Sequence, residues 1–415
     1  MNVYGKIDEK QEESHYQDWS VPEKREGAPI PFFSILLWSL VATAISVALP
    51  FIFGLISPQQ SQDLYTGWAL HQNGQMYTDY FGTEGLLYYV LTYLFQGSIL
   101  IALVEWLALF GAGVFLFKAA NTLVGQEKEA KRLVFILYLL VAGLAFGGGY
   151  ALLLALPFLF YSLSIVTNYL AFPKDDKGFV RVGMSLALAF FLAPIPTVLF
   201  AAVLALGIIG FNLAKGHFVH GLYQFFASAL GFSLLFYPLG YYTVWTGSFG
   251  DAISQTLYPV NTLSLFSNSH LLENAAFYGL LAIGLGSLGL LFAGLFQSKP
   301  AKQYALSIAT SLGLLISLGI LILSQEPING TRLVVLIPFL VLLLLTGIKE
   351  DVSEGGSRRR RRREKQTSFF KGNFYLPLIA LAYLIVLPIV SRYLSHPTTY
   401  QERDRLASVV KQQTS

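Results

Sequence analysis

The sequence contains no cysteine, and only 13% of its 415 residues are charged. The absence of cysteine excludes disulfides, a thiol nucleophile and a thiolate metal site. Soluble domains carry about 25% charged residues. The low charge, with 54% hydrophobic residues and a mean hydropathy of +0.56, therefore excludes a water-soluble enzyme and a largely disordered chain. A net charge of only +4 argues against nucleic-acid binding. The class that remains is a polytopic membrane protein.

Missing motifs narrow the function further. The sequence has no Gly-x-x-x-x-Gly-Lys-[Ser/Thr] pattern, which excludes an ATP-driven motor of that type, and no His-Glu-x-x-His metalloprotease motif. We find no internal repeat, so a transporter built from two inverted halves has no positive support. Apart from residues 349–374 the expected cytoplasmic loops are short and leave no room for a nucleotide-sugar domain.

Apolar runs predict an all-α polytopic membrane protein with about eleven transmembrane helices and additional interfacial helices outside. The first run, 31–56, is long enough to span about 30 Å of hydrocarbon. The other runs are 98–118, 133–147, 150–171, 183–193, 197–214, 222–240, 275–296, 304–324, 333–348 and 375–394. The run 183–193 is too short to cross alone, and Pro194 and Pro196 follow it. We therefore expect a short hairpin over 183–214 rather than one long kinked helix.

The distribution of lysine and arginine predicts the topology. With the N-terminus inside, 23 of the 28 basic residues fall on the cytoplasmic side, which is the positive-inside bias. Residues 1–30 are then a cytoplasmic tail, 31–394 a single transmembrane domain of the plasma membrane, and 395–415 an extracytoplasmic tail. The run Arg358–Arg363, in the cytoplasmic basic loop 349–374, is expected to anchor this topology and to contact anionic lipids.

The first outer loop, 57–97, is long, aromatic and acidic. Asp63 is well placed to cap a short helix of about 64–72, which Gly74 ends. A second interfacial helix is predicted over Leu86–Phe95, leading into the next span. A loop that only joins two helices is usually much shorter, so we expect this one to carry function.

Local patterns in the same loop predict which faces meet the membrane interface. Tyr65, Trp68 and Ala69 share one face of the first short helix, as in helices that lie at a bilayer surface. His71 is expected to be interfacial and structural.

The order of residues in this loop resembles the membrane-embedded C-type glycosyltransferases. The resemblance rests on an acidic residue after the first transmembrane helix, an interfacial helix, a glycine, a Tyr-x-Asp and a second interfacial helix. The aminoarabinose transferase and protein O-mannosyltransferase branch shows this arrangement most clearly. Its members use polyprenyl-phosphate-linked sugars, and an aspartate of the first loop is catalytic. Asp63 matches that aspartate, and Gly74, Tyr77 and Asp79 match the rest.

The resemblance implies transfer of a sugar from an undecaprenyl-phosphate-type carrier to an envelope glycan or other acceptor on the outer face. Asp63 would be the general base, because a carboxylate within hydrogen-bond reach can deprotonate an acceptor hydroxyl. Asp63 as a plain helix cap is the competing interpretation. Asp79 would serve as a second base, a divalent-metal ligand or an acceptor binder. Glu84 is a possible acceptor-binding residue.

Arg332 is the only basic residue expected outside before the last span. A guanidinium at that depth can bind the lipid phosphate. It can equally be a snorkelling anchor or a partner for Glu326.

A second outer loop, 241–274, is expected to cover the site. Its aromatic, acidic and amide side chains suit acceptor binding by stacking and hydrogen bonds. The residues concerned are Trp245, Asp251, Gln255, Tyr258, Asn261 and Asn268.

Three other functions remain open. A ligase or polymerase that moves a whole lipid-linked glycan or teichoic-acid-like chain would use many outer arginines. A transporter or lipid flippase would place charges deep in several helices, where we find mainly Glu105. That residue is otherwise expected to be a structural acid facing the bundle. A non-catalytic scaffold is the last possibility.

Overall fold

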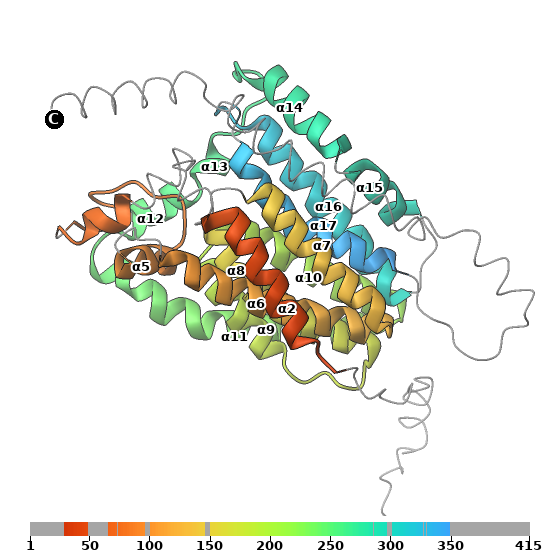
Figure 1. Ribbon diagram of the computed structural model, residues 1–415. Coiled ribbons are helices and arrows are strands. Elements are labelled where there is room, and N and C mark those ends of the chain that lie inside the picture. The colour runs from red at the N-terminus through yellow and green to blue at the C-terminus, as the bar shows by residue number, and fades with distance from the viewer. Residues whose placement is uncertain are drawn as a thin grey trace, which may run out of the picture.

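The computed structural model describes residues 29–48, 65–72, 74–95, 100–145, 150–284, 286–296, 301–326, 328 and 330–348. Within them the regular structure is helical, apart from two isolated β-bridges (Figure 1). A short helix covers residues 65–70. The other elements are α2 (Phe32–Thr43), η1 (Ala44–Ala48), α5 (Leu86–Phe95), α6 (Ile101–Val124), α7 (Glu127–Leu144), α8 (Ala151–Ala171), α9 (Phe179–Phe190), α10 (Pro194–Ala214), α11 (Phe218–Trp245), α12 (Phe249–Thr256), α13 (Tyr258–Asn261), α14 (Leu271–Gly284), α15 (Ser287–Phe296), α16 (Ala301–Leu323), η2 (Gly330–Leu336) and α17 (Ile337–Gly347).

The helices have the lengths and apolar character of a membrane protein. Five of those described are long and apolar enough to cross a bilayer: α6, α8, α10, α11 and α16. The pair α14 and α15 makes a sixth if it is counted as one broken span, bent by 70°. Eleven spans are therefore not confirmed. The predicted run 375–394 lies outside the described residues.

Several predicted runs form helices that are shorter than a full span. The apolar helices 32–47, 86–95, 179–190 and 332–347 all fall below the length of a spanning helix. The run 275–296 is divided at Gly286, whose φ of 66° is a left-handed conformation that interrupts a helix. These breaks reduce the number of helices that qualify as spans.

The stretch 183–214 forms two helices that reverse direction, as predicted. Helix α9 runs parallel to α11, because Gly183 faces Ser228 and the ring of Phe191 stacks on that of Phe236. The turn at 215–217 reverses the chain between α10 and α11. Helices α9 and α10 therefore form a hairpin.

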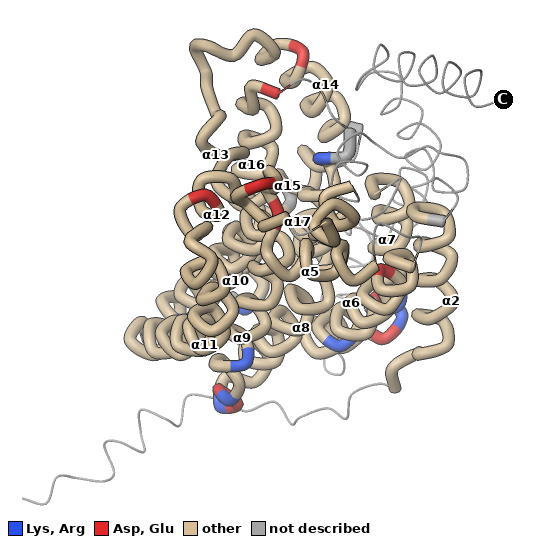
Figure 2. The backbone as a smooth tube through the Cα atoms, turned by 90° about the vertical axis from the view of Figure 1, so that its left-hand side faces the viewer, with Lys and Arg blue, Asp and Glu red and all other residues tan. Residues whose placement is uncertain are grey.

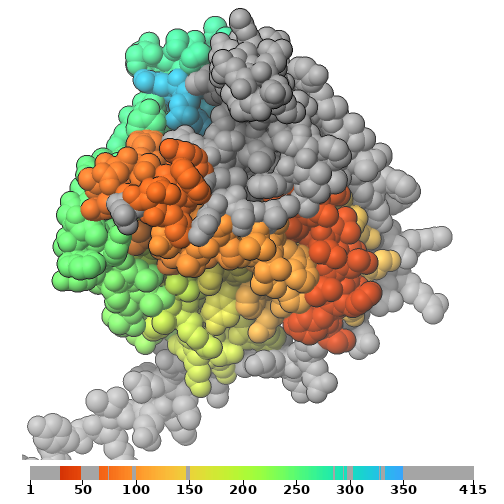
Figure 3. Space-filling view, turned by 60° about the vertical axis from the view of Figure 1, so that its left-hand side comes forward, coloured from red at the N-terminus to blue at the C-terminus, as the bar shows by residue number. Residues whose placement is uncertain are grey.

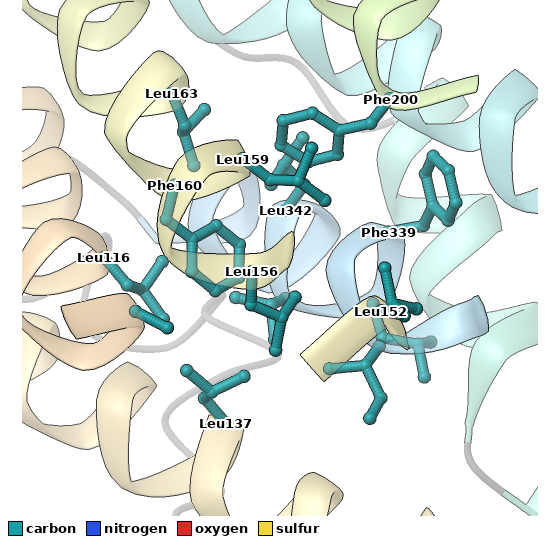
Figure 4. Packing of buried hydrophobic residues seen from close by; sticks show 14 of the residues in the cluster. Leu116, Leu137, Leu152, Leu156, Leu159, Phe160, Leu163, Phe200, Phe339 and Leu342 are labelled. Carbon is teal, nitrogen blue, oxygen red and sulfur yellow. The ribbon is translucent and has the colours of Figure 1, made fainter. Parts of the chain in front are cut away.

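The core lies where α8 and α17 pack among α6, α7 and α10. Every residue of α17 is buried, and so are most residues of α8. Figure 4 shows leucines and phenylalanines of these helices facing one another; they are Leu116, Leu137, Leu152, Leu156, Leu159, Phe160, Leu163, Phe200, Phe339 and Leu342. Glu105 on α6 is also fully buried, so it faces the bundle as expected.

Two glycines allow α9 and α11 to approach unusually closely. A Cβ at Gly183 would overlap the carbonyl oxygen of Ser228, and one at Gly231 would overlap that of Val180. Inside a bilayer, apolar burial does not drive helices together, and close contact at small residues does. This crossing therefore fixes α11 against the bundle.

Lysine and arginine are concentrated at one end of the bundle, which also carries Glu127, Glu129, Asp175 and Asp176 (Figure 2). Of the ten lysines and arginines among the described residues, nine lie at the end that carries the α6–α7, α8–α9 and α10–α11 turns, here called the basic end. They are Lys118, Lys128, Lys131, Arg132, Lys174, Lys177, Arg181, Lys215 and Lys302. The opposite end, here called the acidic end, carries Arg332 and the acids Asp79, Glu84, Asp251, Glu273 and Glu326.

We predict that Gly183→Ala lowers the thermal stability of the purified protein. The added methyl group meets backbone rather than a movable side chain, and overpacking of this kind costs about 1–3 kcal/mol. Gly279→Ala on α14 is the matched control, because no atom lies within 4 Å of its added Cβ. The midpoint of unfolding in detergent measures both. Equal midpoints for the two variants would mean that the α9–α11 crossing is not tight.

Candidate functional site

Two segments that are far apart in sequence lie together at the acidic end. Figure 3 shows the orange surface of residues 65–95 beside the green surface of α11 and α12. The Gln75 side chain donates from Nε2 to the carbonyl oxygen of Thr246 at 2.8 Å. The Gln255 side chain donates to the carbonyl oxygen of Tyr77 at 2.7 Å and accepts from the Gly82 amide at 2.9 Å. The candidate site is built on this junction.

The chain turns tightly between Gln75 and Tyr80. Tyr77 has a φ of 67°, and its amide donates to the Tyr80 carbonyl at 3.1 Å. The Gln75 backbone amide donates to Asp79 Oδ2 at 2.6 Å, and the Asp79 amide donates back to the Gln75 carbonyl at 3.0 Å. The Asp79 carboxylate therefore caps the turn that carries it, as aspartate does in many turns.

Tyr77 is a buried hydrogen-bond donor. Its hydroxyl donates to the Glu84 carbonyl oxygen at 2.8 Å, and its ring meets that of Tyr89 edge to face. Burial, with a smaller contribution from the Glu84 carboxylate, raises the pKa of the Tyr77 phenol above its ordinary value. The phenol therefore stays protonated at neutral pH and holds the loop rather than acting as a base.

The end of α9 supports the start of α5. The Gly85 amide donates to the Leu192 carbonyl at 3.0 Å, and the Leu87 amide donates to the Phe191 carbonyl at 2.8 Å. The Leu192 carbonyl is free for this bond because its partner in a continuous helix would be Pro196, which has no N–H. The proline break after α9 thus creates an attachment point for the first outer loop.

The short helix 65–70 lies on α5. A Cβ at Gly67 would overlap the backbone of Thr92, so the two helices touch there. The His71 ring stacks on Tyr93 with centroids 4.0 Å apart, and its Nε2 lies 2.7 Å from the Tyr93 carbonyl. His71 is therefore structural, as predicted.

Arg332 lies in a polar cluster between η2 and the end of α16. Its guanidinium forms an ion pair with Glu326 and donates to Ser324 Oγ at 2.9 Å. The Asn274 amide donates to the carbonyl oxygens of Ser324 and Glu326 at 2.9 and 3.1 Å. Asn268 donates to the Ser324 carbonyl at 2.9 Å. These bonds fix the backbone at Ser324 and Glu326, and so fix the position from which the Glu326 carboxylate faces Arg332.

Tyr258 connects this cluster with the first outer loop. Its ring meets that of Phe81 edge to face, with centroids 5.5 Å apart. It also lies close enough to Arg332 for an electrostatic interaction. Both rings are about half exposed, at 48% for Phe81 and 40% for Tyr258. The acidic end therefore presents two adjacent aromatic rings, one of which, Tyr258, interacts electrostatically with Arg332.

One comparison with known proteins assigns a family. Residues 23–396 match the family model described as "Putative competence-induced protein Ccs4 N-terminal domain". The chain belongs to this family. No curated protein and no solved structure matches it.

The structure brings together several, though not all, of the residues selected from the sequence. Asp79, Glu84 and Tyr258 lie in or beside the junction, and Asp251 is exposed on α12. Trp245, at the end of α11, is 76% exposed. Asp63 lies outside the described residues. Within the described residues no group of three acidic or histidine side chains is arranged to hold a metal ion.

The structure adds detail to the expectations for three side chains. Tyr65 and Trp68 share an exposed face, but Ala69 is buried. Gln255 was expected to bind an acceptor, yet both ends of its amide bond the first outer loop. Asn268 likewise donates to the carbonyls of Leu323 and Ser324.

The sequence did not indicate the roles of Gln75, Gln255 or Phe81. Each contacts a residue more than 170 positions away, and no local pattern reports such a contact.

We predict that Asp79→Ala loosens the turn while Asp79→Asn largely preserves it. Alanine removes the acceptor of the Gln75 amide, whereas the asparagine side-chain oxygen can still accept. A lost hydrogen bond to a charged group is worth about 1.5–3 kcal/mol, so amide exchange around the turn should rise about 10- to 150-fold in the alanine variant. Hydrogen exchange read by mass spectrometry measures this. Equal loosening in both variants would show that the negative charge, not the acceptor, holds the turn.

Proposed function

We propose that this chain is a membrane glycosyltransferase that moves a sugar from a polyprenyl-phosphate carrier to an acceptor of the cell envelope. The observation that supports it most is the junction at the acidic end. There the acidic first outer loop, the exposed rings of Phe81 and Tyr258, and Arg332 lie together. Aromatic rings suit the faces of a sugar, a carboxylate suits a general base and a guanidinium suits a phosphate.

The charge division supports an orientation for this proposal. We infer that the basic end faces the cytoplasm and the acidic end the outside of the plasma membrane, following the positive-inside bias. The N-terminus would then be cytoplasmic and the C-terminus extracytoplasmic, with eleven spans in all. Arg358–Arg363 would lie against anionic lipids on the cytoplasmic side.

The proposed reaction is a direct displacement at the anomeric carbon. The acceptor hydroxyl gives its proton to the Asp63 carboxylate as its oxygen forms the new bond to the anomeric carbon. The bond between that carbon and the phosphate oxygen breaks, and the lipid phosphate leaves with the electron pair. Arg332 stabilises the charge on the leaving phosphate, and the anomeric configuration inverts. Asp79, already engaged in capping its turn, would have a secondary role.

The family description supports a proposal about when the protein is produced. It names a competence-induced protein, and we infer that this chain too is produced when cells become competent. The description specifies no chemistry. Transfer to an envelope acceptor at that time would alter the cell surface.

We predict that Asp63→Asn abolishes transfer while expression and thermal stability stay near wild type. An amide cannot accept the proton, whereas losing a helix cap costs only about 1 kcal/mol. Asp79→Asn should reduce transfer less. Asp176→Asn, at the basic end, is the matched control and should leave transfer unchanged. The assay follows transfer of a radiolabelled sugar from a polyprenyl phosphate donor in membranes.

Membrane vesicles of known orientation allow the same assay to test also which side of the membrane the acidic end faces. Right-side-out vesicles expose an outward acidic end to added acceptor, so transfer should occur there without detergent. Transfer confined to inverted vesicles would contradict the orientation, and normal transfer by Asp63→Asn would contradict the base.

We predict opposite effects from the two members of the Arg332–Glu326 pair. Arg332→Ala should weaken donor binding about 10- to 150-fold, since a charged hydrogen bond is worth about 1.5–3 kcal/mol. Arg332→Lys should also be impaired because it loses the planar fork. Glu326→Gln should strengthen donor binding, because it removes a competing anion. Transfer measured against donor concentration gives all three values. A wild-type donor dependence in Arg332→Ala would make Arg332 only a partner of Glu326.

A further inference from the structure

The Gln255 side chain spans the turn of the first outer loop. Its Nε2 donates to the Tyr77 carbonyl on one side of the turn, at 2.7 Å, and its Oε1 accepts from the Gly82 amide on the other, at 2.9 Å. Asp79 lies between these two points of attachment. The Gln255 side chain on α12 is thus hydrogen-bonded to both ends of the segment that carries Asp79.

This pair of hydrogen bonds requires the amide group of a glutamine. One donor and one acceptor are needed on the same planar group, and the glutamine amide carries both on neighbouring atoms. Glutamate would set a carboxylate oxygen against the Tyr77 carbonyl, and leucine would form neither bond. Gly82 is buried, and a Cβ there would overlap Met76 and the Tyr89 hydroxyl, so this backbone has little freedom to move toward another partner.

Two other contacts hold the same pair of segments together. Gln75 bonds the Thr246 carbonyl before α12, and Phe81 packs on Tyr258 after it. Among the described residues of α12 and α13, Gln255 alone is hydrogen-bonded to the turn on both sides of Asp79.

We propose that Gln255 is a positioning residue, which fixes the turn that carries Asp79 against α12, beside the substrate of the candidate site. That a substrate binds beside this turn rests on the proposed function. The attachment itself is independent of any reaction.

Spin labels test the attachment directly, because the chain has no native cysteine. Cysteines replace Thr78, exposed in the turn, and Ser254, exposed on α12, and pulsed electron resonance measures the distance between them. In the otherwise unaltered protein we expect one narrow distribution. Gln255→Leu and Gln255→Glu should broaden it, with the detached population rising about 5- to 30-fold for the loss of one or two hydrogen bonds.

A neighbouring residue provides the matched control. Thr256 has no hydrogen bond to the first outer loop among the described residues, so Thr256→Val should leave the distribution narrow. Thermal unfolding of all variants checks that the bundle is intact. A narrow distribution in both Gln255 variants would overturn the proposal.

The effect on transfer distinguishes positioning from general destabilisation. Gln255→Leu should lower kcat by the same factor as the fall in the attached fraction that the spin-label distances give, with donor KM unchanged, because Arg332 is attached elsewhere. A short bis-maleimide bridge between the cysteines at 78 and 254 should restore kcat. Failure of the bridge to restore kcat, in a protein that mass spectrometry shows to be cross-linked, would overturn the positioning role. Broadening without transfer by any variant, wild type included, would refute the proposed function and retain the attachment.

Discussion

The crossing of α9 and α11 determines where the contacts of the acidic end can form. Gly183 and Gly231 bring the two backbones together, and small residues of this kind replace apolar burial as the cause of helix association in a bilayer. Both helices then end at the acidic end, where terminal carbonyl groups lack intrahelical partners. The Phe191 carbonyl accepts from the start of α5, and the Thr246 carbonyl accepts from Gln75. A shift of the crossing would therefore move both supports of the first outer loop.

Sequence reasoning predicted the helices better than the spans. Each apolar run before residue 349 contains a helix in its described part, and the interfacial stretch Leu86–Phe95 coincides with α5. Apolar runs indicate where a helix is favourable, because helix formation there depends on the local composition. They do not report where packing ends or bends it. The left-handed Gly286 and the proline break after α9 shorten helices inside apolar sequence, and five or six of the described helices pass as spans.

The candidate site was predictable only where its residues act locally. Asp79 was selected because the order of residues in its loop resembles that of a glycosyltransferase family, and the tight turn that its carboxylate caps was not predicted. Glu326 lies six positions from Arg332, so their pairing was one of the expected outcomes. Gln255 contributes through backbone groups more than 170 positions away, and any polar side chain on an exposed helix looks the same in sequence. The position of Asp63 relative to these groups stays a prediction.

The charge at the acidic end bears on how an anionic donor would reach it. Five described acids lie at the same end as one described arginine, so the local field there repels free anions in general. Under the proposed function a lipid-linked phosphate overcomes that repulsion, because each buried CH₂ of its chain contributes about 0.8 kcal/mol to staying in the membrane. The bilayer then concentrates the donor beside the bundle, and Arg332 has only to exchange Glu326 for the phosphate. A soluble sugar phosphate lacks that anchorage and meets only the repulsion. The acidic surroundings of Arg332 would thus select donors by their lipid tail.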